Sequence, residues 1–238
     1  MMDDVSKEFQ QRIEKEYEKF NKSIDRPNIL LVGGTGVGKS SLINLVFGEE
    51  VAEVGTGVPI TDGLTKYDSS KVPVILYDTA GYELGTQKQE KFLKEVVDFA
   101  IDNEKSVDNK IHLVWYCIDA SSHRVEDIDK KVIKRLYQSN IPTSVIFTKC
   151  DLITVDEMKM MESEVSNKLP NISMFRVTTI DDAQLKYNLD FLDLEQLINW
   201  SINSLPAGIR VGFIKAQKRN LERSEERRVG KECTLRCR

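Results

Sequence analysis

The sequence has no long apolar run and few cysteines. No stretch approaches the roughly 20 consecutive apolar residues that a membrane-spanning helix needs, and the N-terminus lacks the apolar core of a secretion signal. Only four cysteines occur among 238 residues. Two of them, Cys117 and Cys150, stand in apolar stretches, which is typical of reduced packing residues. These absences predict a cytoplasmic protein.

The chain also lacks an excess of positive charge. Residues 223–238, which begin RSEERRVGKEC, resemble the translation of a DNA-sequencing adapter, and we exclude them as a non-native tail. Without the six basic and three acidic residues of this tail, 28 basic and 35 acidic residues remain, a net charge of −7. Such a chain offers no general electrostatic attraction for nucleic acid. Cys233 and Cys237 belong to the tail, so their spacing is not interpreted as a metal site.

Apolar strands alternate with helical patterns along most of the chain. The expected strands are NILLVGG, VPVILYD, IHLVWYCID, TSVIFTK and ISMFRVT, with a weaker one at residues 64–69. The expected helices cover residues 39–47, 87–103, 126–138, 155–169 and 192–204. Near-continuous apolar strands separated by helices predict an α/β fold. We expect a mostly parallel six-stranded sheet with helices on both faces and the weak strand antiparallel at one edge.

Two amphipathic stretches flank this pattern. Residues 1–25 repeat apolar residues every three or four positions, which predicts a helix that packs on the domain, with membrane attachment as the alternative. We expect the α/β domain at residues 26–205 and a helical connector at residues 206–222. If the tail is non-native, the natural chain continues beyond Leu221. Membrane association is then expected only through that missing C-terminal region.

A glycine-rich segment follows the first strand. Residues 33–40 read GGTGVGKS and fit the pattern GxxxxGK[ST] between a strand and a helix. Glycines let the backbone wrap around phosphate oxygens, whose charge meets amide groups and the helix N-terminus. We expect Lys39 to reach the β- and γ-phosphates and Ser40 to ligate Mg²⁺. The other predicted phosphate-binding positions are Gly33, Thr35, Gly36, Val37, Gly38 and Ser41.

A second signal, DTAG, follows the strand VPVILY. Asp78 and Gly81 belong to it and lie at the nucleotide edge expected of such a sheet. Asp78 is expected to hold a water on Mg²⁺, and the Gly81 amide to contact the γ-phosphate. The spacing of 39 residues between Lys39 and Asp78 makes this short motif informative.

The glycine-rich loop at residues 55–67 supplies a further candidate metal ligand. Thr61 is favoured by its position after Pro59 and Ile60, with Thr56 and Thr65 as alternatives. Such a threonine would complete the Mg²⁺ shell when a triphosphate is bound, and release the loop on hydrolysis.

The segment TKCD, residues 148–151, predicts the base. Asp151 can accept hydrogen bonds from N1–H and the exocyclic amine of guanine, whereas adenine has an acceptor at N1 and no such amine. Lys149 can lay its aliphatic stem across the base, although a surface Lys–Asp pair is the alternative interpretation. The predicted guanine site also includes Thr148. Thr178 and Thr179, at the end of the last strand, are expected to contact the guanine carbonyl through their backbone, and an ordinary strand end is the alternative.

In this order, GGTGVGKS, PIT, DTAG and TKCD resemble the Ras-like, translation-factor class of P-loop GTPases. The flanking residues are similar to those of Era-like, immunity-related and dynamin-like GTPases. The resemblance implies a G domain that binds Mg²⁺–GTP, hydrolyses it to GDP and phosphate, and acts as a conformational switch. Potassium-activated Era-like enzymes carry an asparagine where this chain has Gly36, so the resemblance does not extend to that mechanism.

Tyr82 stands where many such GTPases carry the glutamine that orients the attacking water. Slow intrinsic hydrolysis is therefore expected. Glu83, a backbone-held water in the glycine-rich loop, and Arg124 are the candidate replacements. Arg124 lies in a segment that resembles chloroplast outer-envelope import GTPases, which implies action across a homodimer, while a surface ion pair with Glu126 or Asp127 is the alternative. A GTP-binding assembly module with negligible hydrolysis is the alternative function.

Overall fold

The fold is that of a computed structural model. It describes residues 26–48, 58–61, 64–68, 74–79, 86–103, 109–178 and 192–217, with backbone alone at positions 59, 61 and 86–93. The predicted N-terminal helix at residues 1–25 and the tail at residues 223–238 lie outside this part of the chain. Within it, no helix combines the length and the apolar character needed to cross a membrane.

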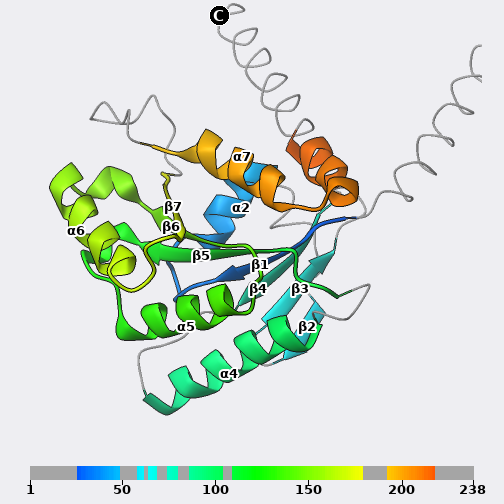
Figure 1. The fold of residues 1–238 in the computed structure, drawn as a ribbon, viewed down its shortest axis with the longest axis horizontal. Coiled ribbons are helices and arrows are strands. Elements are labelled where there is room, and N and C mark those ends of the chain that lie inside the picture. Colours follow the sequence, from blue (N-terminus) through cyan, green and yellow to red (C-terminus); the bar gives the residue numbers. More distant parts are fainter. Residues whose placement is uncertain are drawn as a thin grey trace, which may run out of the picture.

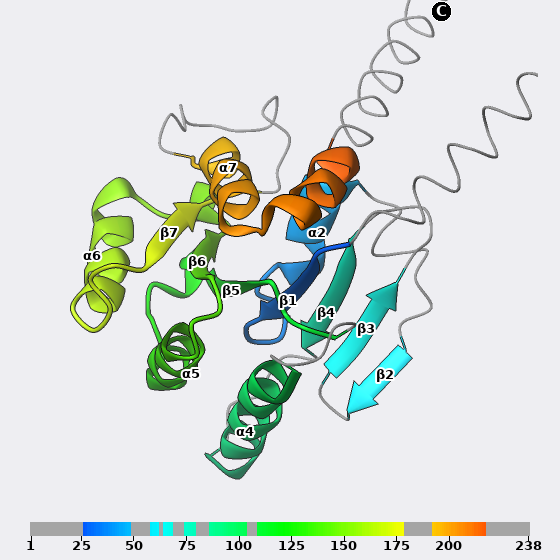
Figure 2. The same ribbon diagram turned by 45° about the vertical axis from the view of Figure 1, so that its right-hand side comes forward.

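A twisted sheet forms the centre of the molecule (Figure 1). Its strands are β1 (Asn28–Val32), β2 (Val58–Thr61), β3 (Leu64–Asp68), β4 (Ile75–Thr79), β5 (Leu113–Asp119), β6 (Thr143–Thr148) and β7 (Ser173–Arg176). They are ordered β2-β3-β4-β1-β5-β6-β7, which can be followed in Figure 2. The strands from β4 to β7 in this order are parallel, and β3 runs antiparallel to both of its neighbours.

The predicted α/β fold is confirmed, and all six expected strands are present. The sheet has one further strand, β2, in the stretch that the sequence assigned to a glycine-rich loop. As a result β3 is an inner strand, and β2 forms the edge. A proline within a run of strand-forming residues argues against a strand. Pro59 is the reason that the sequence did not predict β2. Val58 and Ile60, which share one face of the strand, are 61% and 42% exposed, so the apolar residues of this segment do not mark a buried face.

Helices cover both faces of the sheet (Figure 1). On one face lie α2 (Lys39–Phe47), α7 (Leu194–Ser204) and a C-terminal helix at residues 207–217. The other carries α4 (Thr86–Asp102), α5 (Asp127–Gln138) and α6 (Val155–Ser166). Two short 3-10 turns follow these strands: η2 (Ala120–Ser122) comes directly after β5, and η3 (Cys150–Leu152) follows β6 after Lys149.

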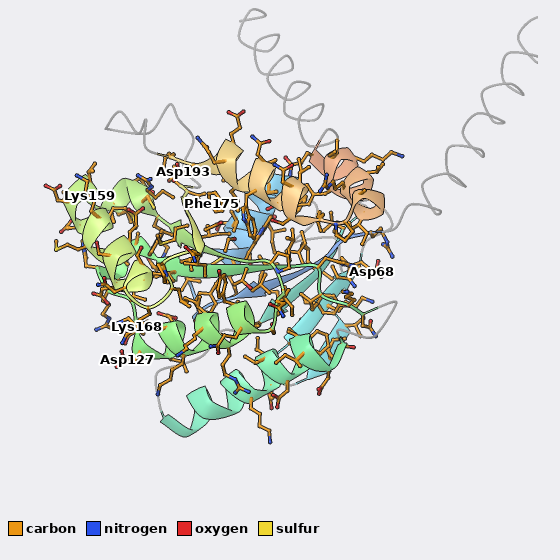
Figure 3. The ribbon with its side chains drawn as sticks, viewed as in Figure 1. Asp68, Asp127, Lys159, Lys168, Phe175 and Asp193 are labelled. Carbon is orange, nitrogen blue, oxygen red and sulfur yellow. The ribbon has the colours of Figure 1, made fainter. Side chains whose placement is uncertain are left out.

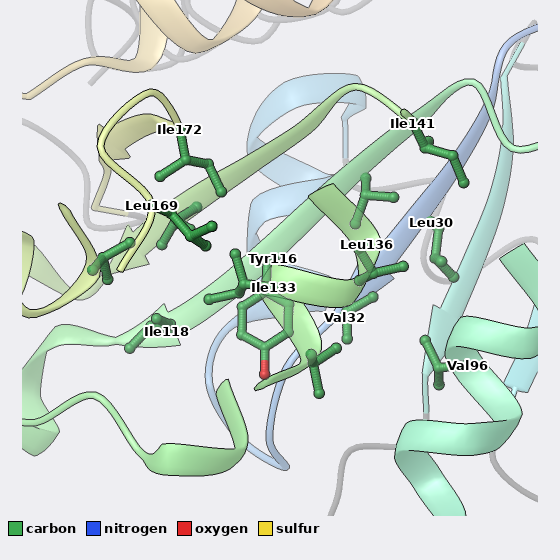
Figure 4. Packing of buried hydrophobic residues seen from close by; sticks show 14 of the residues in the cluster. Leu30, Val32, Val96, Tyr116, Ile118, Ile133, Leu136, Ile141, Leu169 and Ile172 are labelled. Carbon is green, nitrogen blue, oxygen red and sulfur yellow. The ribbon is translucent and has the colours of Figure 1, made fainter. Parts of the chain in front are cut away.

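The sheet separates two apolar layers. Leu30 and Val32 of β1 point into the layer beneath α4, α5 and α6, whereas Ile29 and Leu31 point into the layer beneath α2 and α7. Figure 4 shows α5 lying over the strands in the first layer. Every residue of β1 is buried, as expected for a central parallel strand covered on both faces.

Side-chain caps fix where α5 and α6 begin. The Glu126 amide donates to Asp129 Oδ2 at 2.9 Å, and the Thr154 amide donates to Glu157 Oε2 at 2.9 Å. Both are capping boxes, in which the residue three positions into the helix returns a bond to the cap. Asp129 also accepts from Tyr116 Oη at 2.7 Å, which ties the start of α5 to β5.

The start of α7 is anchored to β7. Asp193 Oδ2 accepts from the Arg176 amide at 3.1 Å and from Arg176 Nε at 2.9 Å. Figure 3 labels Asp193 and Phe175, at the point where α7 begins beside β7. Asp68, labelled far from this point, pairs with Arg26 Nη1 at 2.6 Å and so ties the residues before β1 to β3.

The C-terminal helix packs against the end of α2. The Phe213 ring lies 5.5 Å from the Phe47 ring and 6.3 Å from the Trp115 ring. Gln217 Nε2 donates to the Val46 carbonyl at 2.6 Å. Residues 207–217 therefore contribute to the apolar layer of the sheet, and a connection from them to a further domain stays a prediction.

We expect Phe213→Ala to lower the free energy of unfolding by about 3–5 kcal/mol, because it empties a fully buried site between two aromatic rings. The neighbouring Ile214 is 46% exposed, so Ile214→Ala is the matched control and should change stability by about 0.5 kcal/mol or less. Urea unfolding followed by tryptophan fluorescence measures both. Equal effects of the two changes would contradict the packing of this helix.

Candidate nucleotide-binding site

The parallel strands carry the predicted site residues to one edge of the sheet. β1 leads into Gly33, β4 ends at Asp78 and Thr79, β5 ends at Asp119, and β6 leads into Lys149. Because these strands run in the same direction, their carboxyl ends lie at the same edge. Ligands of open α/β sheets bind at this edge.

The glycine-rich turn after β1 depends on backbone conformations that glycine adopts readily. Gly33, Gly36 and Gly38 have φ angles of 149°, 73° and 95°. A Cβ on Gly33 would lie 2.4 Å from the Cys117 carbonyl oxygen, so a side chain there would push the turn away from β5. A Cβ on Gly36 would meet nothing within 4 Å, so this glycine is required by its φ angle rather than by crowding.

Lys39, the first residue of α2, is held over this turn. Its side chain is buried, and its Nζ donates to the Gly33 carbonyl at 3.1 Å and to the Gly34 carbonyl at 3.0 Å. The ammonium group is thus fixed by neutral acceptors, and its positive charge is not neutralised by these contacts. The hydroxyl-bearing residues Thr35, Ser40 and Ser41 are exposed beside it.

Asp78 approaches Lys39 from β4. Burial raises the pKa of Asp78 to about 6, although the nearby Lys39 charge and the Thr79 amide act in the opposite direction. Asp78 Oδ1 and Thr79 Oγ1 are buried and have no hydrogen-bond partner among the described residues. Buried polar atoms of this kind usually have a hydrogen-bond partner, and a water molecule or a bound ion can fill that place.

A hydrated magnesium ion fits this arrangement. Mg²⁺ prefers oxygen ligands and is usually held by one or two carboxylates together with substrate phosphates. The described part of the chain contains no cluster of three or more His, Cys, Asp or Glu that could enclose a metal by itself. The Asp78 carboxylate and the Ser40 hydroxyl are therefore suited to a metal that arrives with a phosphate ligand.

Thr148, at the end of β6, joins the predicted base site to the glycine-rich turn. Its hydroxyl lies 2.5 Å from the Val37 carbonyl and 3.2 Å from the Ile118 carbonyl. A Cβ on Gly38 would come within 3.5 Å of the Thr148 Cβ. Residues 111 positions apart in the sequence are thereby held in direct contact.

Asp151 and Thr178 are brought together where β6 and β7 end. Asp151 Oδ1 accepts from Thr178 Oγ1 at 2.5 Å, and the Cys150 amide donates to the Val177 carbonyl at 3.2 Å. Two motifs that the sequence assigned to one site are therefore adjacent. The sequence expected Thr178 to act through its backbone, whereas its side chain bonds the predicted base-reading carboxylate.

Lys149 is paired with a residue that sequence reasoning missed. Lys149 has a φ angle of 55°, and its Nζ lies 2.5 Å from Asp119 Oδ2. The surface pair considered for Lys149 and Asp151 is not the one formed. The available signal was an acidic residue at the end of the apolar strand IHLVWYCID, on the edge where the other motifs end.

Arg124 forms a surface ion pair. Its Nε lies 2.6 Å from Glu126 Oε1, and its side chain is 63% exposed. This is the alternative that the sequence left open for Arg124, and a role in catalysis stays a prediction. His123 beside it is also exposed, and its Nδ1 lies 3.4 Å from Glu157 Oε1.

Several predicted positions are not placed by the structure. Thr61 ends β2, but its side chain is not described, while its competitor Thr65 lies in β3 opposite Asp78. Gly81, Tyr82, Glu83, Thr56 and Thr179 lie outside the described residues.

Comparison with protein families matches residues 28–149, just over half of the chain, to the family of 50S ribosome-binding GTPases. The chain belongs to this family of P-loop GTPases. The match covers the glycine-rich turn, DTAG and the start of TKCD, and it confirms the resemblance to the translation-factor class of P-loop GTPases.

Individual relatives agree with the family. GTPase Der from Deinococcus deserti is 30% identical over 147 residues, covering 61% of this chain and 32% of Der. Septin-8-A from Danio rerio is 26% identical over 185 residues, covering 68% of this chain and 44% of the septin. The chain thus spans less than half the length of either relative. The crystal structure of "a probable GTP-binding protein engB" shares the fold, with a TM-score of 0.51 and 20% identity over 77% of this chain and 98% of that one.

The buried Asp78 carboxylate should make the nucleotide-free protein less stable as pH rises. Its folded pKa of about 6 lies above the ordinary 3.8, so its contribution to stability is present at low pH and is lost as pH rises through about 6. Asp78→Asn should remove this loss. At neutral pH its free energy of unfolding should then be higher than that of the wild type by up to roughly 3 kcal/mol, which raises the thermal midpoint.

Thermal unfolding in the absence of nucleotide and Mg²⁺, measured across this pH range, tests the expectation. Asp156→Asn is the matched control, because the Asp156 side chain is 90% exposed and should leave the pH profile unchanged. A profile of Asp78→Asn that parallels the wild type would show that Asp78 is not held in a desolvated position.

Proposed function

We propose that the chain binds Mg²⁺–GTP and hydrolyses it to GDP and phosphate, changing conformation between the two states. The main support is the contact of Thr148 with the Val37 carbonyl, which holds a phosphate-binding turn and a guanine-reading motif side by side. Membership of a GTPase family supports the same function. A cytoplasmic location, proposed from the sequence, accompanies it.

In this proposal the turn at residues 33–38 surrounds the phosphates with amide groups at the N-terminus of α2. Lys39 exchanges its bonds to the Gly33 and Gly34 carbonyls for phosphate oxygens, for which it is already positioned. Ser40 would ligate Mg²⁺ and Asp78 would hold a water on it, and the ion would supply positive charge beside the phosphates. Thr61 would complete the Mg²⁺ shell, and the Gly81 amide would contact the γ-phosphate.

The base is read by Asp151, with Lys149 lying across its face. The Thr178 hydroxyl orients the Asp151 carboxylate at 2.5 Å. Oδ2 and the remaining lone pair of Oδ1 can then accept from N1–H and the exocyclic amine of guanine. Thr179 follows in the chain and completes the contact with the guanine carbonyl. Adenine would leave this carboxylate unpaired, a loss that discriminates strongly between bases.

Hydrolysis is proposed to be slow in the isolated chain and activated by a partner. Tyr82 has no amide with which to orient water, and phosphoryl transfer depends on positioning and on charge supplied to the transition state. Glu83 is one candidate to position the water. Arg124, exposed after β5, is the candidate for a charge supplied across a homodimer at the nucleotide face.

Asp151→Asn should exchange guanine preference for xanthine preference, because the amide replaces one acceptor of guanine protons with a donor suited to the xanthine carbonyl. Competition of GDP and XDP against a fluorescent nucleotide measures the change. The matched control is Asp156→Asn, an exposed acid away from the site. A variant that keeps the wild-type preference for GDP would refute the base assignment.

Single-turnover GTP hydrolysis should speed up as protein concentration rises, if two copies meet at the nucleotide face. Lys39→Ala should abolish turnover at every concentration, because it removes the charge over the phosphate turn. Arg124→Ala should remove the concentration dependence, whereas Arg135→Ala should not. Arg135 is similarly exposed but lies in the last turn of α5.

The alternative function, a GTP-binding assembly module, is favoured by Tyr82 alone. It predicts tight GTP binding with negligible turnover at all protein concentrations. Robust turnover in the Lys39→Ala variant would instead contradict both functions, since neither allows hydrolysis without the phosphate site.

A further inference from the structure

We infer that Asp119 is a positioning residue of the guanine site, which fixes the Lys149 ammonium so that the lysine stem is held ready for the base. The inference deepens the proposed function and rests on it. Its basis is the contact of 2.5 Å between Asp119 Oδ2 and Lys149 Nζ, at the edge where the nucleotide motifs end.

The sheet register places the two residues. Asp119 is the last residue of β5, and it lies opposite Thr148, the last residue of β6. Lys149 follows with a left-handed backbone conformation, φ 55°, which turns the chain at the strand end. A carboxylate at the end of β5 is therefore within reach of a lysine at this turn, although 30 residues separate them in the sequence.

The Asp119 carboxylate is also held by hydrogen bonds that do not involve the lysine. Its Oδ1 accepts from the Ser121 amide at 2.9 Å and from Ser121 Oγ at 2.6 Å. These bonds belong to the η2 turn that follows β5 and leave Oδ2 for Lys149. Each carboxylate oxygen thus has a different task, and the lysine meets an acceptor that is already oriented.

The charges agree with this arrangement. Partial burial opposes ionisation of Asp119, but the hydrogen bonds from Lys149 and Ser121 outweigh it and hold the pKa of Asp119 below its ordinary value. The carboxylate is therefore ionised at neutral pH, and the contact is a charge-assisted hydrogen bond.

This pair is less exposed than the surface ion pair between Lys159 and Asp156. The Asp119 and Lys149 side chains are 20% and 36% exposed, whereas Lys159 and Asp156 are 68% and 90% exposed. Exposed pairs contribute little, because water screens them and two long side chains must be ordered. The Asp119 side chain is short, half-buried and already bonded at its other oxygen. Forming the pair with Lys149 therefore costs less side-chain entropy than forming a pair of two long, exposed side chains.

Asp119→Asn tests the inference directly. The amide retains an oxygen that can accept from Ser121 but loses the charge that holds Lys149. We expect fluorescent GDP to bind roughly tenfold more weakly, the loss typical of one charge-assisted contact. Glu164→Gln is the matched control, because it breaks the pair of 2.9 Å with Lys130 away from the site and should leave GDP affinity unchanged.

A double-mutant cycle separates positioning from a general structural effect. Lys149→Met keeps an aliphatic stem but has no ammonium for Asp119 to hold. In that background Asp119→Asn should change GDP affinity less than about twofold. Equal losses with and without Lys149→Met would overturn the inference, as would wild-type affinity of Asp119→Asn alone.

If Asp119→Asn does not fold, Ser121→Ala replaces it in the double-mutant cycle. It removes only the hydroxyl that orients Asp119, so it should weaken GDP binding to a smaller extent and again only when Lys149 is present. Thermal unfolding without nucleotide establishes that each variant is folded. A loss of affinity that persists in the Lys149→Met background would overturn the positioning role.

Base preference distinguishes failure of this inference from failure of the proposed function. Asp119→Asn should weaken GDP and XDP equally, since the lysine stem does not read the base edge, whereas Asp151→Asn should exchange their order. If Asp151→Asn leaves the order unchanged, the guanine site is wrong. If it exchanges the order but Asp119→Asn affects one nucleotide alone, the site stands and the positioning role is refuted.

Discussion

The hydrogen bond from Thr148 to the Val37 carbonyl is the contact on which the site depends. It joins the carboxyl end of β6 to the glycine-rich turn after β1, across the intervening strand β5. The same hydroxyl lies near the Ile118 carbonyl of that strand. The proposed base-reading and phosphate-binding motifs can act together only at a fixed separation, and this contact holds them against each other.

Two charged side chains of the candidate site, Lys39 and Asp78, are buried away from water. Lys39 is buried with backbone carbonyls as its partners, and Asp78 is buried with a pKa raised to about 6. Desolvated charges weaken a fold unless the surrounding packing compensates. Apolar packing is found at the other end of α2, where the helix that starts at Lys39 ends at Phe47, packed between Trp115 and Phe213. The proposed phosphate site and the C-terminal helix therefore lie at opposite ends of one helix.

Sequence patterns predicted the parallel strands and most helices because both are buried, and burial leaves a periodic apolar record. The same record is absent at Val58 and Ile60, whose side chains are exposed around Pro59, and strand β2 was missed. Asp119 was missed for another reason. Its role depends on the pairing of β5 with β6, and neither strand's own pattern states its register. Motifs specify a site's chemistry, whereas contacts between motifs require the fold.

The acidic residues at the strand ends show how the fold assigns different tasks to similar groups. Asp119 has one oxygen on Ser121 and the other on Lys149, and Asp151 is bonded by Thr178. Asp78 keeps a buried oxygen for which the described residues supply no partner. A carboxylate satisfied by protein groups positions or reads a ligand, whereas one left unsatisfied in a buried place is suited to a cation. This difference in partners, rather than residue type, makes Asp78 the metal candidate among the three.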